Sequence, residues 1–254
     1  MGYLARVSID LNADLGAGCG ESNEDLDRLF LGLATSVNIA CGAHVGDPAT
    51  ILNACGEASA SGVAIGALIG YRDPFGGGRR FIDYDADDLT AEIIYQLGAL
   101  DGLALTEGSR VSHLRPAGAL MVAVETDRHH AWAIVNAVLD YDPSLVVVGA
   151  PNSALVTTAE RHGVPTALEF QPHRMPRTST EAGRLIADPH LVTRRAIDAA
   201  DSGRYATLRL PRVSPAGIDL ARAVVTGLVH AGHRPQAFVA QETPATARAG
   251  IDSG

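Results

Sequence analysis

The stretch SVNIACGAHVGDPATILNACGEASAS, residues 36–61, contains a complete unit of strand, loop and helix. Its first six residues are mostly apolar and predict a buried strand over 36–41. Asp47 and Pro48 predict the start of a helix, because aspartate caps the first helical turn and proline is favoured at the first helical position. The helix continues through ATILNACGEASAS. This stretch therefore predicts one βα step of an α/β fold.

The same rhythm recurs along most of the chain. Helices are expected to begin after Thr126, after Asn152 and at Asp188-Pro189. Further strands are predicted by six apolar runs: LARVSIDL (4–11), VAIGAL (63–68), VSHLR (111–115), LVVVGA (145–150), TALEF (166–170) and ATLRL (206–210). Seven alternating units without a linker favour a single α/β domain over 1–240, a seven-stranded parallel (β/α) barrel rather than an open doubly wound sheet. The last residues, 241–254, lack an apolar pattern and are predicted to form a loose tail.

The composition limits the classes of partner. The chain has 254 residues, of which 46% are hydrophobic, and a formal net charge of −9. An acidic chain without long basic blocks is a poor ligand for nucleic acid or for an anionic membrane. No apolar run approaches the roughly 20 residues of a membrane span. Three cysteines without a CxxC spacing predict reduced thiols, so a cytoplasmic protein is expected.

Polar residues at the carboxyl ends of the predicted strands are the candidates for chemistry, since parallel α/β folds place their active sites there. After the first strand, Asp10, Asn12 and Asp14 alternate, so their side chains share one face. Polar groups on a buried strand cost free energy unless they have partners. This cost favours a functional role over simple loop capping.

The second strand and the loop after it hold four further candidates, which are Asn38, Cys41, His44 and Asp47. Asp47 is predicted to cap the following helix, and Cys41 to be a small core residue. His44 lies in a turn flanked by glycines, which lets a ligand approach the backbone closely. We therefore predict that His44 acts as a ligand or as a general acid or base.

The third strand leads into a glycine-rich loop, IGYRDPFGGGRR, residues 69–80. Arg79 and Arg80 supply fixed positive charge that suits a carboxylate or a phosphate group. A solvated surface loop is the alternative, because a glycine-rich run alone is weak evidence for a binding site.

Two later strands also end in polar side chains, which are His113, Arg115, Glu169, His173 and Arg174. His113 and Arg115 alternate and so share one face of their strand. His129 and His130 fall within an amphipathic helical segment instead, and we predict that both are surface residues.

Five motifs in this order resemble the LamB/YcsF family. They are IDLNADLG (9–16), TSVNIACGAHVGDP (35–48), GVAIGALIGYRDPFGGGRR (62–80), YQLGAL (95–100) and VSHLRPAGALM (111–121). The resemblance implies a (β/α) barrel related to metal-dependent polysaccharide deacetylases. It also implies ATP-dependent hydrolytic opening of the lactam 5-oxoproline, or of a related lactam, to glutamate. The resemblance further implies two partner subunits of the 5-oxoprolinase type, and a homo-oligomer is compatible with the sequence.

The resemblance also implies roles for individual residues. Catalytic roles fall to Asp14, His44 and His113, which are also the candidate ligands if a divalent metal is used. ATP is implied as a co-substrate. Binding of substrate or nucleotide falls to nine residues: Asp10, Asn12, Asn38, Tyr71, Asp73, Arg79, Arg80, Arg115 and Arg174.

The chain departs from the family pattern at several of these motifs. Leu68 and Ala117 stand where the family has histidines, and we predict that they form an apolar patch in the pocket. LRLPRVSPAG, residues 208–217, stands in place of a terminal HGD motif. Two alternatives therefore remain beside the lactam hydrolase. One is a catalytically impaired homologue that acts as a ligand-binding or scaffold subunit, and the other is a metal-dependent deacetylase-like amidohydrolase.

Overall fold

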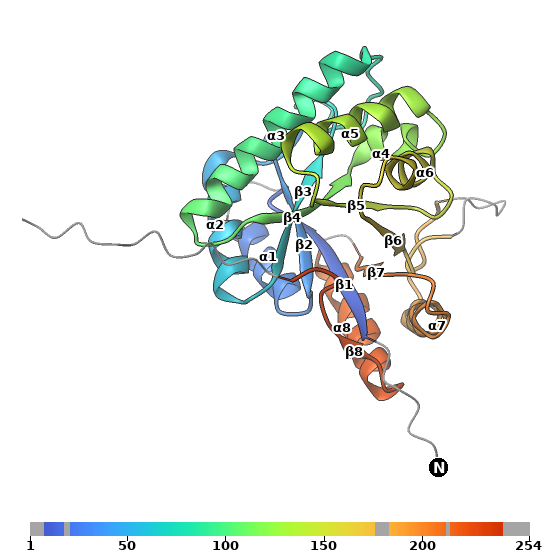
Figure 1. The fold of residues 1–254 in the computed structure, drawn as a ribbon. Coiled ribbons are helices and arrows are strands. Elements are labelled where there is room, and N and C mark those ends of the chain that lie inside the picture. Colours follow the sequence, from blue (N-terminus) through green and yellow to red (C-terminus); the bar gives the residue numbers. More distant parts are fainter. Residues whose placement is uncertain (1–7, 18–20, 176–182, 212–213, 241–254) are drawn as a thin grey trace, which may run out of the picture.

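The computed structural model describes residues 8–17, 21–175, 183–211 and 214–240. Seven parallel strands close into a barrel (Figure 1), because β1 pairs with β2 on one side and with β7 on the other. The predicted (β/α) barrel is therefore confirmed. A two-residue strand, β8 (Arg234–Pro235), pairs with the start of β1. The barrel strands are β1 (Ser8–Leu15), β2 (Ser36–Ala40), β3 (Ala64–Ile69), β4 (Val111–Pro116), β5 (Val146–Gly149), β6 (Thr166–Phe170) and β7 (Thr207–Arg209).

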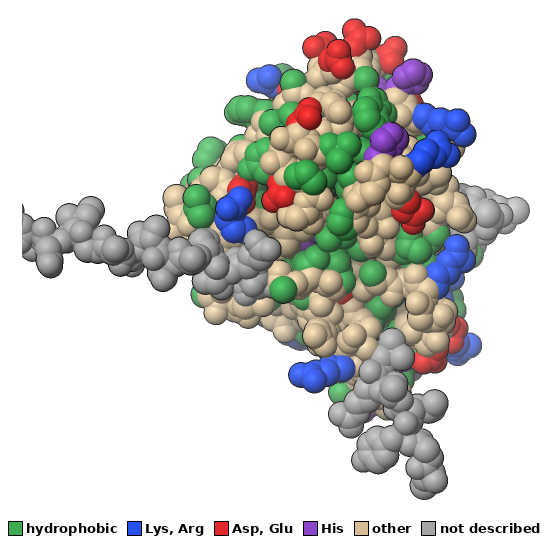
Figure 2. All heavy atoms as spheres, in the orientation of Figure 1, with side chains coloured by type: hydrophobic (Ala, Val, Ile, Leu, Met, Phe, Trp, Pro, Cys, Tyr) green, Lys and Arg blue, Asp and Glu red, His purple; other side chains and the backbone are tan. Residues whose placement is uncertain are grey.

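Helices surround the barrel in Figure 1 and lie between successive strands of the sequence. Among the described residues, no helix combines the length and the apolar composition that a membrane span needs. Acidic side chains gather at one end of the face drawn in Figure 2, and the first turn of α3 carries Asp87 and Asp88. The helices are α1 (Glu21–Leu31), α2 (Pro48–Ala60), α3 (Ala86–Thr106), α4 (Gly118–Ala123), α5 (Arg128–Tyr141), α6 (Ala154–Arg161), α7 (Pro189–Asp201) and α8 (Pro215–His230).

The helix starts follow the predicted capping chemistry, with two shifts of one residue. Asp47 and Asp188 cap α2 and α7 as predicted, since their carboxylates accept hydrogen bonds from backbone N–H groups of the first turn. The caps of α5 and α6 are Asp127 and Ser153, one residue later than predicted, because these are the side chains that reach the free N–H groups.

The first strand differs most from its prediction. It runs from Ser8 to Leu15 rather than ending at residue 11, and the predicted residues 4–7 lie outside the described residues. Strand β1 pairs with β2 as far as Leu15, so Asn12 and Asp14 lie within the strand together with Asp10 instead of after it. Their polarity hides the strand from a search for apolar runs. The predicted tail, 241–254, also lies outside the described residues.

The two faces of the barrel wall have opposite chemistry. Leu11, Ala13 and Leu15 of β1 join the apolar core that packs against the helices. The alternate residues of the same strand point into the barrel, where they contact polar residues of β2, β4 and β7. The inside of this barrel is therefore polar, and the apolar core lies between strands and helices.

The prediction for His130 is wrong. His129 is exposed, but His130 is buried, and its Nδ1 lies 2.7 Å from the hydroxyl of Tyr71. Its ring also stacks on Phe81, and Tyr71 stacks on Tyr84. The helical pattern of α5 did not reveal this, because the partners of His130 come from the loop after β3.

A substitution of Gly66 in β3 can show how tightly side chains fill the interior of the barrel. A Cβ at this position would overlap Nε2 of His113, whose ring lies against the glycine. We expect Gly66→Ala to lower the free energy of unfolding by about 1–3 kcal/mol, the usual cost of overpacking. Gly102→Ala in α3 is the matched control, because nothing lies within 4 Å of its Cβ and alanine favours the helix. Urea unfolding of both variants checks this, and equal stability of Gly66→Ala and wild type would contradict it.

Candidate active site

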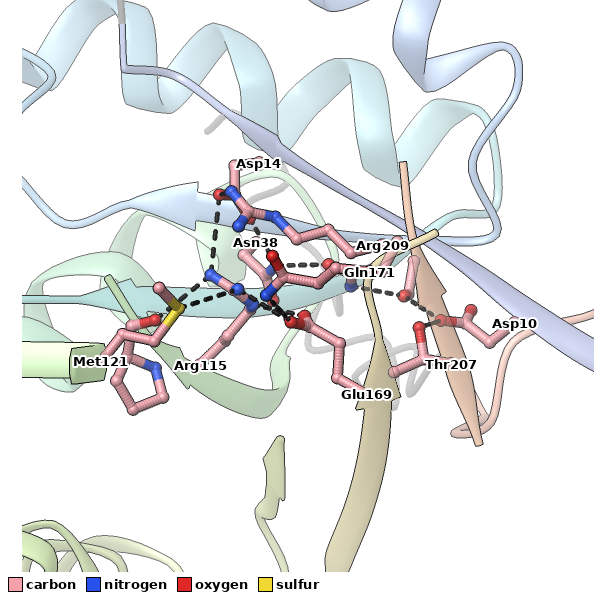
Figure 3. Close-up of polar contacts among 12 residues, drawn as sticks. Asp10, Asp14, Asn38, Arg115, Met121, Glu169, Gln171, Thr207 and Arg209 are labelled. Atoms are coloured by element: carbon pink, nitrogen blue, oxygen red, sulfur yellow. Dashed lines mark hydrogen bonds and ion pairs between the residues drawn. The ribbon is translucent and has the colours of Figure 1, made fainter. Parts of the chain in front are cut away.

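A network of polar side chains fills the inside of the barrel toward the carboxyl ends of the strands (Figure 3). Asp14 lies at its centre and pairs with Arg209 of β7, while its Oδ2 is 3.7 Å from Nη1 of Arg115 on β4. Asn38 of β2 donates through Nδ2 to Oδ1 of Asp14 at 2.9 Å. Burial opposes ionisation of Asp14, but the charges of Arg209 and Arg115 hold its pKa below the usual range. Asp14 is therefore a carboxylate.

A second ion pair lies next to the first. Arg115 donates to Glu169 of β6 twice, from Nε to Oε2 at 2.5 Å and from Nη2 to Oε1 at 2.9 Å. Gln171 donates to the same carboxylate at 2.6 Å. Burial raises the pKa of Glu169, but the charge and hydrogen bonds of Arg115 outweigh it, so the pKa lies below its ordinary value. Two carboxylates and two guanidinium groups thus share a buried space.

Asp10 lies at the other end of the network. Its carboxylate accepts hydrogen bonds from three hydroxyl groups, those of Thr35 at 2.6 Å, Ser36 at 2.8 Å and Thr207 at 2.5 Å. Asn12 donates to Ser36 at 2.7 Å and accepts from Asn38, which connects Asp10 to Asp14. Asp10 and Asn12 therefore hold the strands together below the site, and their predicted role in binding stays a prediction.

His44 lies buried in the loop after β2, and its ring nitrogens are available for hydrogen bonding or proton transfer. Its ring is held between Gly70 and Gly78, where a Cβ would lie 2.8 Å from Nδ1 and 2.9 Å from Cδ2 respectively. Neither ring nitrogen has a hydrogen-bond partner among the described residues. Burial lowers the pKa of His44, although the charges of Asp14 and Asp73 oppose this. A neutral imidazole is thus available to exchange a proton.

His113 lies in a different environment. Its Nδ1 is 3.0 Å from the hydroxyl of Ser112, and its ring lies against Gly66 and edge-on to Phe238. It is completely buried, and burial lowers its pKa to about 3. These contacts place His113 in the packing of the barrel, and its catalytic role stays a prediction.

The glycine-rich loop after β3 is built around Asp73. This buried carboxylate accepts from the backbone N–H of Gly76 at 2.9 Å and of Arg80 at 3.2 Å, and it also pairs with the Arg80 guanidinium. These hydrogen bonds lower the pKa of Asp73 to about 2. Tyr71 anchors the same loop through His130. Tyr71, Asp73 and Arg80 therefore give the loop its shape, and ligand binding by them stays a prediction.

The last two predicted arginines lie apart from each other. Arg79 is exposed at the rim of an open depression of about 490 Å³, which Phe81, Gly118 and Asp127 also line. Arg174 lies after β6, where its Nη1 is 3.4 Å from the carbonyl oxygen of Gly183 and its buried Nε has no partner in the described ranges. Of these two, Arg174 belongs to the surroundings of the network, since its charge acts on Arg209.

Leu68 and Ala117 lie close together near the carboxyl ends of β3 and β4. Leu68 is in register with Arg115, and the N–H of Ala117 donates to the carbonyl of Ile69 at 2.8 Å. Both are buried, yet neither belongs to the apolar core that packs against the helices. This placement supports the predicted apolar patch.

The candidate metal ligands do not come together. Within the ranges that the structure describes, no three His, Cys, Asp or Glu side chains form a group that could hold a metal ion. Asp14 pairs with arginines, and the ring of His113 packs against Gly66 and Phe238. The residues present therefore do not fit a metal centre of the predicted composition.

Sequence reasoning missed Arg209 and Gln171, and it noted Glu169 without giving it a role. Arg209 alternates with Thr207 and ends a strand, which is the signal that singled out Asp14. Residues 208–217 attracted attention only because they lack the expected terminal HGD motif, so Arg209 itself was passed over. Gln171 follows β6 directly, as a residue of an active face does.

Comparison with known proteins identifies the family of the chain. The LamB/YcsF family model matches residues 9–242. The chain belongs to this family. It is 39% identical over 248 residues to a Mycobacterium marinum protein named as the A subunit of 5-oxoprolinase, covering 91% of this chain and 98% of that protein. A protein of the same name from Streptomyces avermitilis is 39% identical over 250 residues, covering 91% and 99%.

Solved structures support the same conclusion. The crystal structure of a lactam utilization protein from Thermus thermophilus superposes with a TM-score of 0.83 at 34% identity, covering 91% of this chain and 99% of that chain. A peptidoglycan N-acetylglucosamine deacetylase from Eubacterium rectale gives a TM-score of 0.52 at 11% identity, covering 93% and 90%. That likeness concerns the fold alone, and it agrees with the predicted deacetylase-like barrel.

The Arg115–Glu169 pair should behave as one unit. We expect Arg115→Met to lower the free energy of unfolding by about 3–5 kcal/mol, because it leaves the Glu169 carboxylate buried without its cation. The double variant Arg115→Met/Glu169→Leu should be at least ~1 kcal/mol more stable than the sum of the single effects predicts. Chemical unfolding checks both, with the exposed pair Arg28–Glu57 as control, where Arg28→Met should leave the free energy of unfolding close to that of wild type. Strict additivity at the buried pair would contradict the expectation.

Asp10 should make stability depend on pH. Burial raises the pKa of Asp10 from 3.8 to about 6, so the folded protein binds a proton that the unfolded chain releases between these values. The stabilisation that this group provides is fully present below about pH 4 and is lost as the pH rises through about 6, which amounts to on the order of 3 kcal/mol. Asp10→Asn removes the titration. The difference in unfolding free energy between wild type and Asp10→Asn should therefore change over this range, and a constant difference would refute the assignment.

Proposed function

We propose that this protein is the A subunit of a 5-oxoprolinase, which opens the lactam 5-oxoproline to glutamate by ATP-dependent hydrolysis together with two further subunits. The observation that carries the proposal is the 39% identity, over nearly their whole length, to proteins named as this subunit in Mycobacterium marinum and Streptomyces avermitilis. The name of these relatives also supports a multi-subunit complex with a small-molecule substrate.

The geometry of the barrel mouth supports lactam chemistry. Opening the ring requires water to add to the lactam carbonyl carbon, the ring C–N bond to break and the nitrogen to gain a proton. The neutral His44 imidazole has two free nitrogens among the described residues, so it suits the acceptance of a proton from water and its delivery to the leaving nitrogen. The Asp14 carboxylate favours the imidazolium formed in between.

ATP is the proposed co-substrate, and its hydrolysis to ADP and phosphate makes ring opening favourable. Arg79 is the residue of the glycine-rich loop best placed for a phosphate contact, because it is exposed beside the 490 Å³ depression. Asp127 lines the same depression and opposes an anion. One arginine does not match a triphosphate, so this depression alone does not form a complete ATP site and no step is assigned to it.

A ligand-binding subunit without catalytic competence is the second candidate. It is favoured by Leu68 and Ala117, whose side chains can neither donate nor accept a proton. This candidate keeps recognition of the lactam and assigns catalysis to the partner subunits.

The two candidates differ in what His44 does. We expect the full complex to release glutamate from 5-oxoproline only with ATP, and His44→Asn to lower kcat about a hundredfold or more, because a positioned acid or base contributes 10²–10⁴-fold. Arg222→Gln on α8 is the control and should leave kcat unchanged, since the side chain is exposed on the outer helix layer. Glutamate release is followed by a coupled assay.

The outcomes separate the two candidates. Unchanged kcat in His44→Asn would assign the chemistry to another subunit and favour the ligand-binding candidate. Absence of ATP-dependent turnover in the wild-type complex would overturn the proposed activity.

A further inference from the structure

Asp14 and Arg209 form the solvent-facing end of the network. The exposed fractions of their side chains are 18% and 14%, whereas those of Arg115 and Glu169 are 3% and 6%. Figure 3 shows Arg209 reaching across from β7 toward Asp14. A small molecule at the barrel mouth therefore meets Asp14 and Arg209 before the inner pair.

The two arginines differ in how many of their donors are in use. Arg115 donates from Nε and Nη2 to Glu169, and from Nη1 to the carbonyl of Pro116 at 3.2 Å. Within the part of the chain that the structure describes, the guanidinium of Arg209 has one side-chain partner, Asp14, which it contacts through Nη2. Arg209 thus keeps N–H donors in the planar arrangement that suits a carboxylate.

The charge around Arg209 favours an anion. The charged groups of the described residues that act most strongly on it are those of Arg115, Asp14, Glu169 and Arg174. With Arg209 itself, three guanidinium groups face two carboxylates among these described residues, so positive charge exceeds negative charge by one in this group. Burial and the charge of Arg115 both lower the pKa of Arg209, which agrees with an excess of positive charge around it. A ligand with a single carboxylate neutralises this excess.

Polar atoms near Asp14 that have no partner among the described residues indicate which other groups the ligand carries. Oδ1 of Asn38 and both ring nitrogens of His44 are buried without a partner among the described residues. The amide of Asn38 already donates to Asp14, so its free oxygen lies next to the ion pair. That oxygen requires a donor, and a neutral imidazole offers one donor and one acceptor. A cyclic amide supplies both an N–H and a carbonyl oxygen.

We propose that Arg209 binds the carboxylate of the substrate and makes the site selective for lactams that carry a carboxylate beside the ring nitrogen. Asn38 then accepts the lactam N–H. This assignment rests on the proposed function and deepens it, because it names the residue that separates an anionic lactam from a neutral one. The substrate carboxylate takes the free donors of Arg209, while Asp14 keeps its contacts with Arg115 and Asn38.

The test compares two ligands of nearly equal shape, 5-oxoproline and its uncharged amide, 5-oxoprolinamide. Their dissociation constants are measured by calorimetry on the purified full chain and on the complex with its partner subunits. Wild type should prefer 5-oxoproline. Arg209→Gln should weaken binding of 5-oxoproline about tenfold to a hundredfold, the effect of losing hydrogen bonds to a charged group, and leave binding of the amide unchanged.

Two variants keep the test interpretable. Arg209→Lys retains the charge and should lose less affinity for 5-oxoproline than Arg209→Gln, and it also serves if the glutamine variant does not fold. Arg222→Gln on α8 should leave both dissociation constants as in wild type. Wild-type preference for 5-oxoproline in Arg209→Gln, with wild type active, would overturn the role of Arg209 alone. If the glutamine variant does not fold, wild-type affinity for 5-oxoproline in Arg209→Lys would overturn it instead, because lysine lacks the planar donors that the proposal requires. Failure of the wild-type complex to bind or turn over 5-oxoproline would overturn both this role and the proposed function.

Discussion

The ion pairs inside the barrel are the constraint on which the site depends. Asp14 and Glu169 are carboxylates in a buried space, and such groups are tolerated only when cations and hydrogen-bond donors face them. Arg115 faces both carboxylates, and Arg209 faces Asp14. Because the four residues come from β1, β4, β6 and β7, they ionise as described only when the barrel is closed.

Glycines make room for this polar interior. The imidazole of His44 lies between Gly70 and Gly78, and that of His113 lies against Gly66, so side chains at these positions would displace the rings. The loop that carries Gly78 is held from within by the hydrogen bonds of Asp73, and Tyr71 anchors it to His130 of α5. Residues that resemble a binding loop in the sequence thus serve mainly to fix the place of one histidine.

The departures from the family pattern change the character of the mouth. Leu68 and Ala117 make one side apolar at positions where the motifs that the sequence resembles carry histidines. Arg209 ends β7 in the region where the terminal motif was expected. In the function proposed above, proton transfer depends on His44 and recognition of charge depends on the arginines. Buried guanidinium groups beside an apolar patch suit the binding of an anion.

Apolar runs and capping residues determined the order of strands and helices, because a strand that is buried on both faces and a capped helix each leave a local pattern in the sequence. The same local reasoning placed Asp14, Asn38 and His44 at strand ends. It ended β1 too early, put His130 on the surface and passed over Arg209. Each of these errors concerns a polar side chain whose partner lies far away in the chain, such as Thr207 for Asp10 or Tyr71 for His130. Burial and ionisation of such groups depend on contacts between distant strands, and only the closed barrel provides them.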